Sequence, residues 1–156
     1  MRRLRGAVVR DRPRHRLYTQ VAERAKHRCE YCLAPDEFSS KEFHVEHVTP
    51  RVRGGPDVLD NLALACFRCN LSKATAQVVR IADEELEIAL FNPRTNDWNA
   101  HFEFVLVPED EVALIQGKNA VGRVTVLRLR MNAPHAARAR WKWFLAYALE
   151  AEYLSD

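Results

Sequence analysis

The sequence predicts an α+β fold of short helices and strands organised around two cysteine pairs. The pairs are Cys29–Cys32 and Cys66–Cys69, each with two residues between the cysteines. Residues 42–49, between the pairs, alternate between apolar and polar side chains, as a strand does. The second half of the chain adds strand-like apolar runs and a helix-like end. A length of 156 residues suits one domain of ordinary size.

The N-terminal part predicts a basic arm followed by a helix. Residues 1–15 are rich in arginine and form the expected arm. Residues 16–28 place Leu17, Val21 and Ala25 on one stripe at helical spacing. Basic residues in the last turns suit the negative end of the helix dipole. This helix would lead the chain to the first cysteine pair.

The stretch between the cysteine pairs predicts one arm of a hairpin and a loop. Residues 42–49 form the arm, and Pro50 ends it. Residues 51–56 contain Gly54-Gly55-Pro56 and are predicted to be a loop. The other assignments are a polar loop at 33–41, a short turn with a strand or helical piece at 57–65, and a helix at 70–80 beginning beside the second cysteine pair.

The second half predicts a less distinct set of elements. Strands are expected at 86–91 and 102–107, while residues 120–131 fit either a helix or a strand. Asn132 is expected to cap a final helix, with Pro134 in its first turn. The apolar stripe of this helix would consist of Ala137, Trp141, Phe144, Leu145 and Ala148.

Charge is distributed unevenly along the chain. Residues 1–28 carry ten Lys or Arg and two Asp or Glu, and residues 112–149 carry seven basic residues and no acidic one. Residues 29–111 carry seven basic and sixteen acidic residues. Two basic flanks around an acidic centre suit a protein that grips a polyanion such as DNA. The alternative is that both flanks are solvated surfaces.

Cellular location is inferred from what the sequence lacks. No apolar run is long enough to span a bilayer, and the apolar stretch near the N-terminus is too short for a secretory signal. We therefore expect a cytoplasmic protein with no membrane partner. In a reducing compartment, cysteines in such pairs are metal ligands more often than disulfides.

The four cysteines predict a structural zinc site. Zinc prefers a tetrahedral shell, and a CxxC turn brings two thiolates to one ion. Two such turns close the shell around Zn²⁺, with Cys29, Cys32, Cys66 and Cys69 as ligands. The alternatives are four free buried thiols or a redox pair. The gap between the pairs exceeds that of a usual zinc ribbon, so a further element must be inserted there.

Several motifs lie in, between and just after the cysteine pairs: Glu46-His47-Val48-Thr49-Pro50, Gly54-Gly55, Asn61-Leu62, Cys66-Phe67-Arg68-Cys69-Asn70 and Lys73. Together they resemble the HNH endonuclease family in its zinc-stapled form. The third motif residue, often histidine in the family, is Asn70 here. The resemblance implies a ββα-metal, treble-clef-like core at 16–80, with residues 81–156 as an extension that packs on it. It also implies cleavage of DNA, leaving 5′-phosphate and 3′-hydroxyl ends.

The central residues have a chemistry that suits phosphodiester hydrolysis. His47 can take a proton from water, because an unperturbed imidazole is largely free base at neutral pH. Glu46 and Asn70 offer a carboxylate and an amide oxygen, which suit Mg²⁺ or Mn²⁺. The resemblance implies that Asn61 bonds across the hairpin loop and orients the base. Each residue also has a structural interpretation: Asn70 could cap a helix, and Asn61 could be a turn residue.

Four basic residues near this centre are candidates for contact with DNA phosphates or for plain exposure to solvent: Arg51, Arg53, Arg68 and Lys73. In the extension, the same alternatives hold for Arg123, Arg128, Arg130, Arg138, Arg140 and Lys142. A layer that packs on the core is the simpler interpretation of the extension.

Two rival functions remain open on sequence alone. One is a zinc-stapled DNA-binding module without catalysis, and the other is a protein-interaction domain of the treble-clef kind. The pairing of Glu46 with His47 beside a third oxygen ligand favours the enzyme, because a binding module has no need of it. A single site makes one nick per protomer, so either a monomer or a homodimer is compatible with the sequence.

Overall fold

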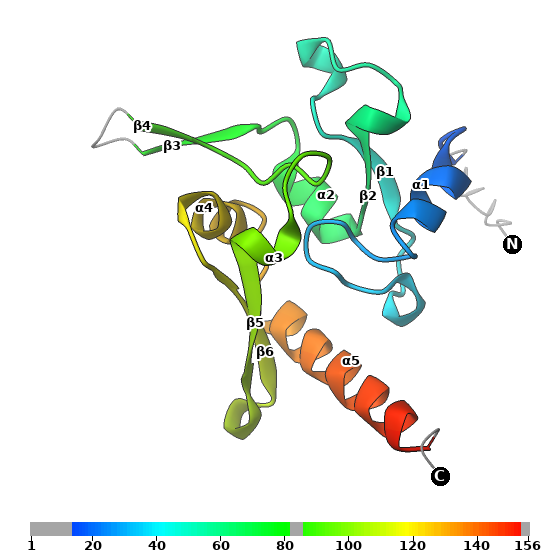
Figure 1. Ribbon diagram of the computed structural model, residues 1–156, viewed down its shortest axis with the longest axis vertical. Coiled ribbons are helices and arrows are strands. Elements are labelled where there is room, and N and C mark those ends of the chain that lie inside the picture. Colours follow the sequence, from blue (N-terminus) through cyan, green and yellow to red (C-terminus); the bar gives the residue numbers. More distant parts are fainter. Residues whose placement is uncertain (1–13, 82–85, 154–156) are drawn as a thin grey trace, which may run out of the picture.

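The computed structural model describes residues 14–81 and 86–153 (Figure 1). The basic arm expected at 1–15 lies outside these residues except for its last two positions. The helices are α1 (Tyr18–Arg24), α2 (Phe67–Lys73), α3 (Trp98–His101), α4 (Ala120–Arg128) and α5 (Pro134–Tyr153). The strands are β1 (His44–His47), β2 (Leu62–Ala65), β3 (Val78–Ile81), β4 (Leu86–Ala89), β5 (Phe102–Val107) and β6 (Val112–Gly117). The described chain therefore mixes helices and strands, as the sequence predicts.

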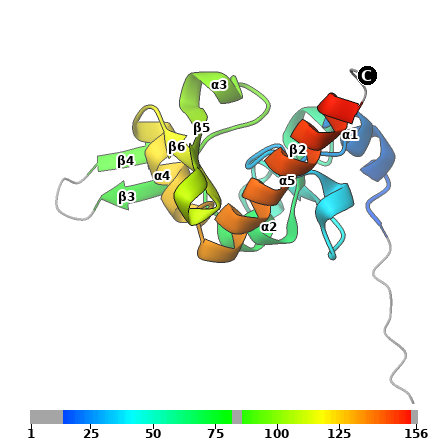
Figure 2. The ribbon, with the colours of Figure 1, turned by 90° about the horizontal axis from the view of Figure 1, so that it is seen from below.

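The strands form three separate antiparallel pairs, β1–β2, β3–β4 and β5–β6. In the first pair, His44 lies opposite Ala65 and His47 lies opposite Leu62. The β3–β4 pair projects from one end of the molecule, and α1 lies at the other end (Figures 1 and 2). Three short 3-10 turns fall between the cysteine pairs: η1 (Asp36–Phe38), η2 (Arg51–Arg53) and η3 (Leu59–Asn61). A fourth, η4 (Pro108–Asp110), joins β5 to β6.

The first part of the core is built around β2. All four residues of this strand are buried, because α1 packs on β2 and α2 packs on both β1 and β2. A strand covered in this way reads as a continuous apolar run, here Leu-Ala-Leu-Ala, and has no alternating pattern. Val21 of α1 and Tyr31 of the first cysteine turn are fully buried beside it. Along the chain, the helix α2 directly follows β2, the second strand of the pair β1–β2.

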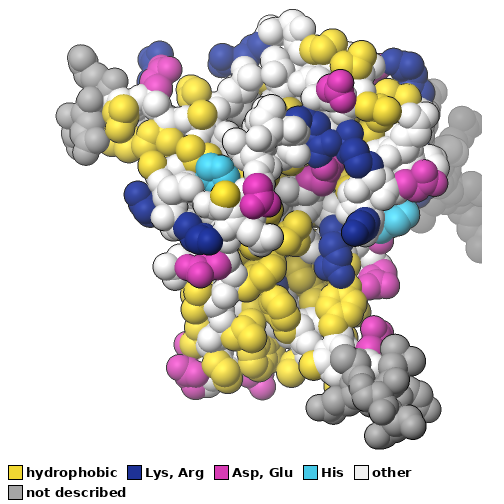
Figure 3. All heavy atoms as spheres, viewed as in Figure 1, with side chains coloured by type: hydrophobic (Ala, Val, Ile, Leu, Met, Phe, Trp, Pro, Cys, Tyr) yellow, Lys and Arg dark blue, Asp and Glu magenta, His cyan; other side chains and the backbone are white. Residues whose placement is uncertain are grey.

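The second part of the fold is built around β6. Helices α4 and α5 both pack on this strand, and α4 also contacts β4. Asn119 caps α4, since its Oδ1 accepts a hydrogen bond from the Gly122 backbone N–H at 2.9 Å. Apolar side chains gather on the lower part of the face in Figure 3, over β5, β6 and α5. Phe104 of β5 and Phe144 of α5 meet there edge to face, with ring centroids 5.1 Å apart.

Two predictions about these elements are wrong. The helix expected at 70–80 begins at Phe67 and ends at Lys73, where Ala74 has a positive φ of 48°. The following residues form β3, whose β-branched side chains favour a strand. Asn132 does not cap α5. Its amide exchanges two hydrogen bonds of 2.8 Å with the backbone of Ile115 in β6, which fixes the start of α5 against that strand.

Two further elements differ from what the sequence suggested. The strand β6 was not predicted, although its alternation of buried and less buried residues suits a half-covered strand. For residues 120–131 the sequence left helix and strand open, and the structure has the helix α4 over Ala120–Arg128. The expected stripe of α5 is shifted as well, since Leu145 is 47% exposed while Arg140 is buried.

Arg140 is an arginine inside the core of the extension. Its side chain is 1% exposed, and it donates to the carbonyl oxygens of Ala113 at 2.5 Å and Met131 at 2.8 Å. It thus ties α5 both to β6 and to the end of the segment after α4. Arg140 was a candidate for DNA contact, but its guanidinium is occupied inside the protein.

Replacing Arg140 should therefore destabilise the fold. We expect Arg140→Leu to lower the free energy of unfolding by about 3 kcal/mol, because two buried carbonyl groups lose a charged donor. The matched control is Arg138→Leu, at an exposed position of the same helix. This substitution should change the free energy of unfolding by less than about 0.5 kcal/mol. Urea denaturation of both variants measures the difference. Equal stability of the two variants would contradict this role of Arg140.

Candidate active site and cysteine cluster

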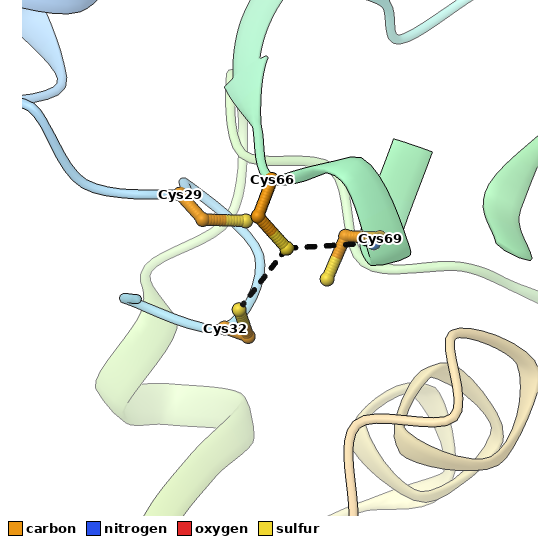
Figure 4. A group of neighbouring side chains, drawn as sticks. All are labelled: Cys29, Cys32, Cys66 and Cys69. Atoms are coloured by element: carbon orange, nitrogen blue, oxygen red, sulfur yellow. Dashed lines mark hydrogen bonds between the residues drawn. The ribbon is translucent and has the colours of Figure 1, made fainter. Parts of the chain in front are cut away.

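The four cysteines converge on one point (Figure 4). Cys29 and Cys32 lie in the turn after α1, Cys66 is the N-cap of α2, and Cys69 lies in its first turn. All four Sγ atoms lie within 4.8 Å of one another, and those of Cys32 and Cys66 are 3.8 Å apart. Zn–S bonds of about 2.3 Å in a tetrahedron put sulfurs about 3.8 Å apart. The four side chains can therefore hold one metal ion.

The protonation of this cluster is unequal. Burial raises the pKa of the Cys29 thiol, and hydrogen bonds from the other three thiols lower the pKa of Cys66. The cysteines form no disulfide. A metal ion binds thiolates and releases their protons, so it would relieve the cost of holding negative charge among buried sulfurs.

Glu46 lies on the inner face of β1 and is paired with a lysine. Its Oε2 accepts a hydrogen bond from the Nζ of Lys73 at 3.0 Å, and its Oε1 accepts one from the hydroxyl of Tyr31. The side chains of Lys73 and Glu46 are only 2% and 5% exposed. Burial, followed by the negative charge of Glu46, raises the pKa of Tyr31 well above its usual value. The carboxylate thus has a partner for each oxygen.

Lys73 also holds the end of β1. Its Nζ donates to the carbonyl oxygens of His47 at 3.3 Å and Val48 at 3.1 Å, besides Glu46. The sequence made Lys73 a candidate for DNA contact, but its ammonium lies inside the protein, on the residue expected to bind a cation. A divalent ion at Glu46 would have to share or replace this ammonium.

Asn70 lies one helical turn before Lys73, on α2. It is half-buried, and among residues 14–81 and 86–153 its side chain makes no hydrogen bond. Its backbone N–H donates to the carbonyl of Cys66 at 3.0 Å, as in any helix. The helix cap is Cys66, so Asn70 does not serve as one. Its amide oxygen is available as a ligand.

Asn61 closes the loop between β1 and β2. Its Oδ1 accepts from the Thr49 N–H at 2.9 Å, and its Nδ2 donates to the carbonyls of Thr49 at 3.0 Å and Pro56 at 2.9 Å. Gly55 fits beneath this clamp, since a Cβ there would lie 1.7 Å from the Thr49 carbonyl oxygen. The loop is therefore held in one conformation just after His47.

His47 points to the other face of β1 and meets two residues that the sequence did not suggest. Its Nε2 lies 3.1 Å from Oδ1 of Asp57, in the clamped loop. The same Oδ1 lies 2.7 Å from Nε2 of His15, which comes from the segment before α1. The two rings meet edge to face, with centroids 6.0 Å apart. All three side chains are half-buried.

Two arginines surround this carboxylate. Arg16 and Arg51 each place a guanidinium nitrogen 3.2 Å from Oδ2 of Asp57, and Arg51 Nε also lies 3.2 Å from Nε2 of His47. The hydrogen bond from His15, followed by that from Arg16, keeps the pKa of Asp57 far below its usual range. Asp57 is therefore ionised at neutral pH. Arg51 remains largely exposed beside His47, where it can also meet a phosphate.

Arg53 and Arg68 lie apart from this cluster. Arg53 is exposed on the turn η2. Arg68 lines a pocket of about 660 Å³ between the cysteine turn and α5, together with Phe67, Met131 and Trp143. None of the residues around His47 lines this pocket. Of the four predicted DNA contacts, Arg51 contacts the ring of His47, and Lys73 contacts its backbone carbonyl oxygen from inside the protein.

The sequence carried a weak signal for one of the two missed residues. Asp57 directly follows Gly54-Gly55-Pro56, so an acidic residue in a tight loop ten positions after His47 could have been included. His15 carried no such signal, because it lies in a basic stretch 32 positions before His47. Only the docking of α1 on β1 and β2 brings it to the site.

Comparison with known proteins finds a family match for the segment that carries the four cysteines and His47. Residues 29–75 match the model of the HNH endonuclease family. This segment is an HNH domain sequence. The HNH segment includes the four cysteines, Glu46, His47, Asn61 and Asn70, and leaves out His15.

A curated relative supports the same conclusion. The chain is 38% identical over 55 residues to the CRISPR-associated endonuclease Cas9 of Corynebacterium diphtheriae. The match covers 35% of this chain and 5% of the length of that relative. No solved structure matches the chain significantly. Among the described residues, no helix is long and apolar enough to cross a membrane.

The Glu46–Lys73 pair gives a stability prediction for the HNH segment. Lys73→Met should lower the free energy of unfolding by about 3–5 kcal/mol, because it leaves a buried carboxylate without its cation. The double variant Glu46→Gln with Lys73→Met should recover most of this loss, since no charge then remains buried. Chemical denaturation of the two variants and the wild type gives the coupling. A double variant no more stable than Lys73→Met would refute the pair.

Proposed function

We propose that this protein is a metal-dependent HNH endonuclease that hydrolyses phosphodiester bonds of DNA. The observation that carries the proposal is the position of His47 at the end of β1, beside a clamped loop and next to α2. The family match of residues 29–75 and the similarity to an endonuclease support a nuclease. The succession of β1, β2 and α2 agrees with a ββα-metal core, in which a hairpin presents the base and a helix presents a ligand.

The four cysteines hold a structural zinc ion in this proposal. A shell of four thiolates has no open position, so the ion would take no part in the reaction. Its role would be to tie the turn after α1 to the start of α2. Because α2 carries Asn70 and Lys73, this tie also places those residues opposite β1.

His47 acts as the general base. A histidine imidazole in its neutral form has a lone pair that can accept the proton of the attacking water. Its side chain lies at the strand end and is 14% exposed, so it is in part open to solvent. Asn61, through its bonds to Thr49 and Pro56, orients the backbone on which His47 stands.

Glu46 and Asn70 hold a divalent cation, Mg²⁺ or Mn²⁺, in this proposal. The oxygen donors of the two residues suit such an ion, which when bound supplies positive charge for the phosphate and the departing 3′ oxygen. Glu46 is paired with Lys73 in the structure, so ion and ammonium would compete for Oε2. Asn70 offers its carbonyl from the facing helix.

The exposed arginines contribute to binding of the polyanion. Arg51 stands beside His47, and Arg53 follows two positions later on the same turn. Both can contact phosphates flanking the cleaved bond, and affinity for DNA would then fall with salt. Arg68, beside its pocket, is the remaining candidate from the HNH segment.

Loss of the base should abolish cleavage. His47→Ala should slow conversion of supercoiled plasmid by about 10²- to 10⁴-fold, the usual contribution of a general base. Wild type should nick or linearise the plasmid with Mg²⁺ or Mn²⁺ and not with EDTA.

The matched control for this experiment is His44→Ala, an exposed histidine of the same strand. It should retain wild-type activity. Cleavage that persists in His47→Ala would exclude His47 as the base. DNA binding without cleavage by the wild type in any metal would instead indicate a binding module.

Removal of a cysteine should remove the structural metal. Elemental analysis of the purified wild type should give one zinc per chain, and Cys69→Ser should lose it. Because the binding energy of a structural zinc is folding energy, the variant should lose its cooperative melting transition. A variant that melts cooperatively at the wild-type temperature would show that the metal is not needed for the fold.

A further inference from the structure

In the cluster formed by His15, Asp57 and His47, the hydrogen bonds determine which nitrogen of His15 carries the proton. The Nδ1 of His15 accepts a hydrogen bond from the backbone N–H of Leu17 at 3.1 Å. A neutral ring that accepts at Nδ1 carries its proton on Nε2. His15 Nε2–H is therefore the donor in the 2.7 Å contact with Oδ1 of Asp57.

Asp57 is held through both its carboxylate and its backbone carbonyl. His15 and Arg16 bind its carboxylate, and Arg16 Nη2 also donates to its backbone carbonyl at 2.9 Å. The Asn61 clamp on Pro56 fixes the preceding residue. An ionised carboxylate fixed in this way has an oxygen 3.1 Å from His47 Nε2, and that oxygen can only accept a hydrogen bond.

We propose that Asp57 and His15 are positioning residues for His47: Asp57 accepts the Nε2–H of His47 and so leaves Nδ1 as the atom that takes the proton from water. This inference rests on the proposed nuclease function and extends it to residues that the HNH segment match does not assign. It follows the general arrangement in which a base is oriented by a third group. His15 acts one step further out, by holding Asp57.

Arg51 makes the arrangement depend on substrate. Its Nε lies 3.2 Å from the same Nε2 of His47 and can bond to it only when that nitrogen is unprotonated. Asp57 and Arg51 therefore favour opposite tautomers of His47. A phosphate that binds the exposed guanidinium of Arg51 removes the competing hydrogen bond. His47 then bonds to Asp57 alone and keeps its proton on Nε2, which is the tautomer that the reaction needs.

The same three side chains would also be a donor set for a transition metal, and the hydrogen bonds argue against that use. A ring that binds a metal through Nε2 must keep a lone pair there and carry its proton on Nδ1. In His15, Nδ1 already accepts from the Leu17 N–H. Two guanidinium groups on Asp57 further oppose a second cation.

The consequence is that the site extends beyond the HNH segment. His15 lies 14 positions before the first residue of the matched segment, yet it contacts Asp57 within it. The turn into α1 carries both His15 and Arg16, so the residues before α1 complete the environment of His47.

The first test reads the tautomer directly and needs no activity. Long-range ¹H–¹⁵N spectra of the full chain, zinc loaded, with inorganic phosphate present to engage Arg51 and at a pH where histidines are neutral, should place the proton of His47 on Nε2. In Asp57→Ala this preference should be lost. A wild-type proton on Nδ1, or a spectrum unchanged by Asp57→Ala, would overturn the proposal. Loss of the His47 and His15 signals on adding Co²⁺ alone, with the cysteine site filled, would indicate a metal site instead.

The second test separates positioning from binding. Asp57→Ala should lower kcat for plasmid cleavage by about 10- to 100-fold, as loss of orientation does, with KM for DNA changed less than about two-fold. His15→Gln, which keeps a donor, should retain more of kcat than His15→Leu. Asp60→Asn, an exposed acid of the same loop, is the control and should resemble wild type.

The two tests fail differently. Full kcat in Asp57→Ala, or equal kcat in the two His15 variants, would overturn the positioning roles while the nuclease stands. A wild type that does not cleave DNA but carries the proton of His47 on Nε2 would overturn the proposed function, and the spectra alone would then support the geometry.

Discussion

The buried pair of Glu46 and Lys73 is the interaction on which the arrangement of the site depends. A lysine inside a protein requires a partner, since burying an unpaired charge is costly. Lys73 meets that requirement with the Glu46 carboxylate and with two carbonyl oxygens at the end of β1. It thereby holds α2 against the strand that carries His47. Glu46 faces inward to reach it, and by the alternation of a strand His47 faces the other way.

The loop after His47 is held by a second set of polar contacts, the hydrogen bonds of the Asn61 side chain. The Asn61 amide bridges Thr49 and Pro56, and Gly55 permits the close approach. A tight loop of this kind presents Asp57 to His47 at hydrogen-bond distance. The two sets of contacts meet at Val48, whose carbonyl oxygen accepts from Lys73 and whose N–H donates to the carbonyl oxygen of Asn61.

The buried residues of the extension belong to the same core as those of the HNH segment, since Phe91 and Phe102 cluster with Tyr31 and the residues of β2. The arginines of the extension divide into two kinds: Arg140 is buried and ties α5 to β6, whereas Arg138 is exposed on the same helix. Part of the excess of basic residues in this region therefore lies inside the protein. A count of charges along the sequence overstates how basic the exposed surface is. The extension also contacts the HNH segment through Trp98, whose Nε1 donates to the carbonyl oxygen of Tyr31 at 2.9 Å, and it lines the pocket between α5 and the cysteine turn.

The sequence by itself determined the features that depend on local spacing. Two CxxC pairs predict four converging thiols, and residues 42–49 followed by Pro50 predict a strand that ends just after His47. The expectation that Asn61 bonds across the loop came from the resemblance to the HNH family. The helix expected at 70–80 was wrong because a positive φ at Ala74, which no pattern announces, ends α2 early. Only the tertiary structure decided the partners: Lys73 turns inward to Glu46, and His15 reaches Asp57. These pairings join residues 27 and 42 positions apart, so they follow from how helices dock on strands and not from any local pattern.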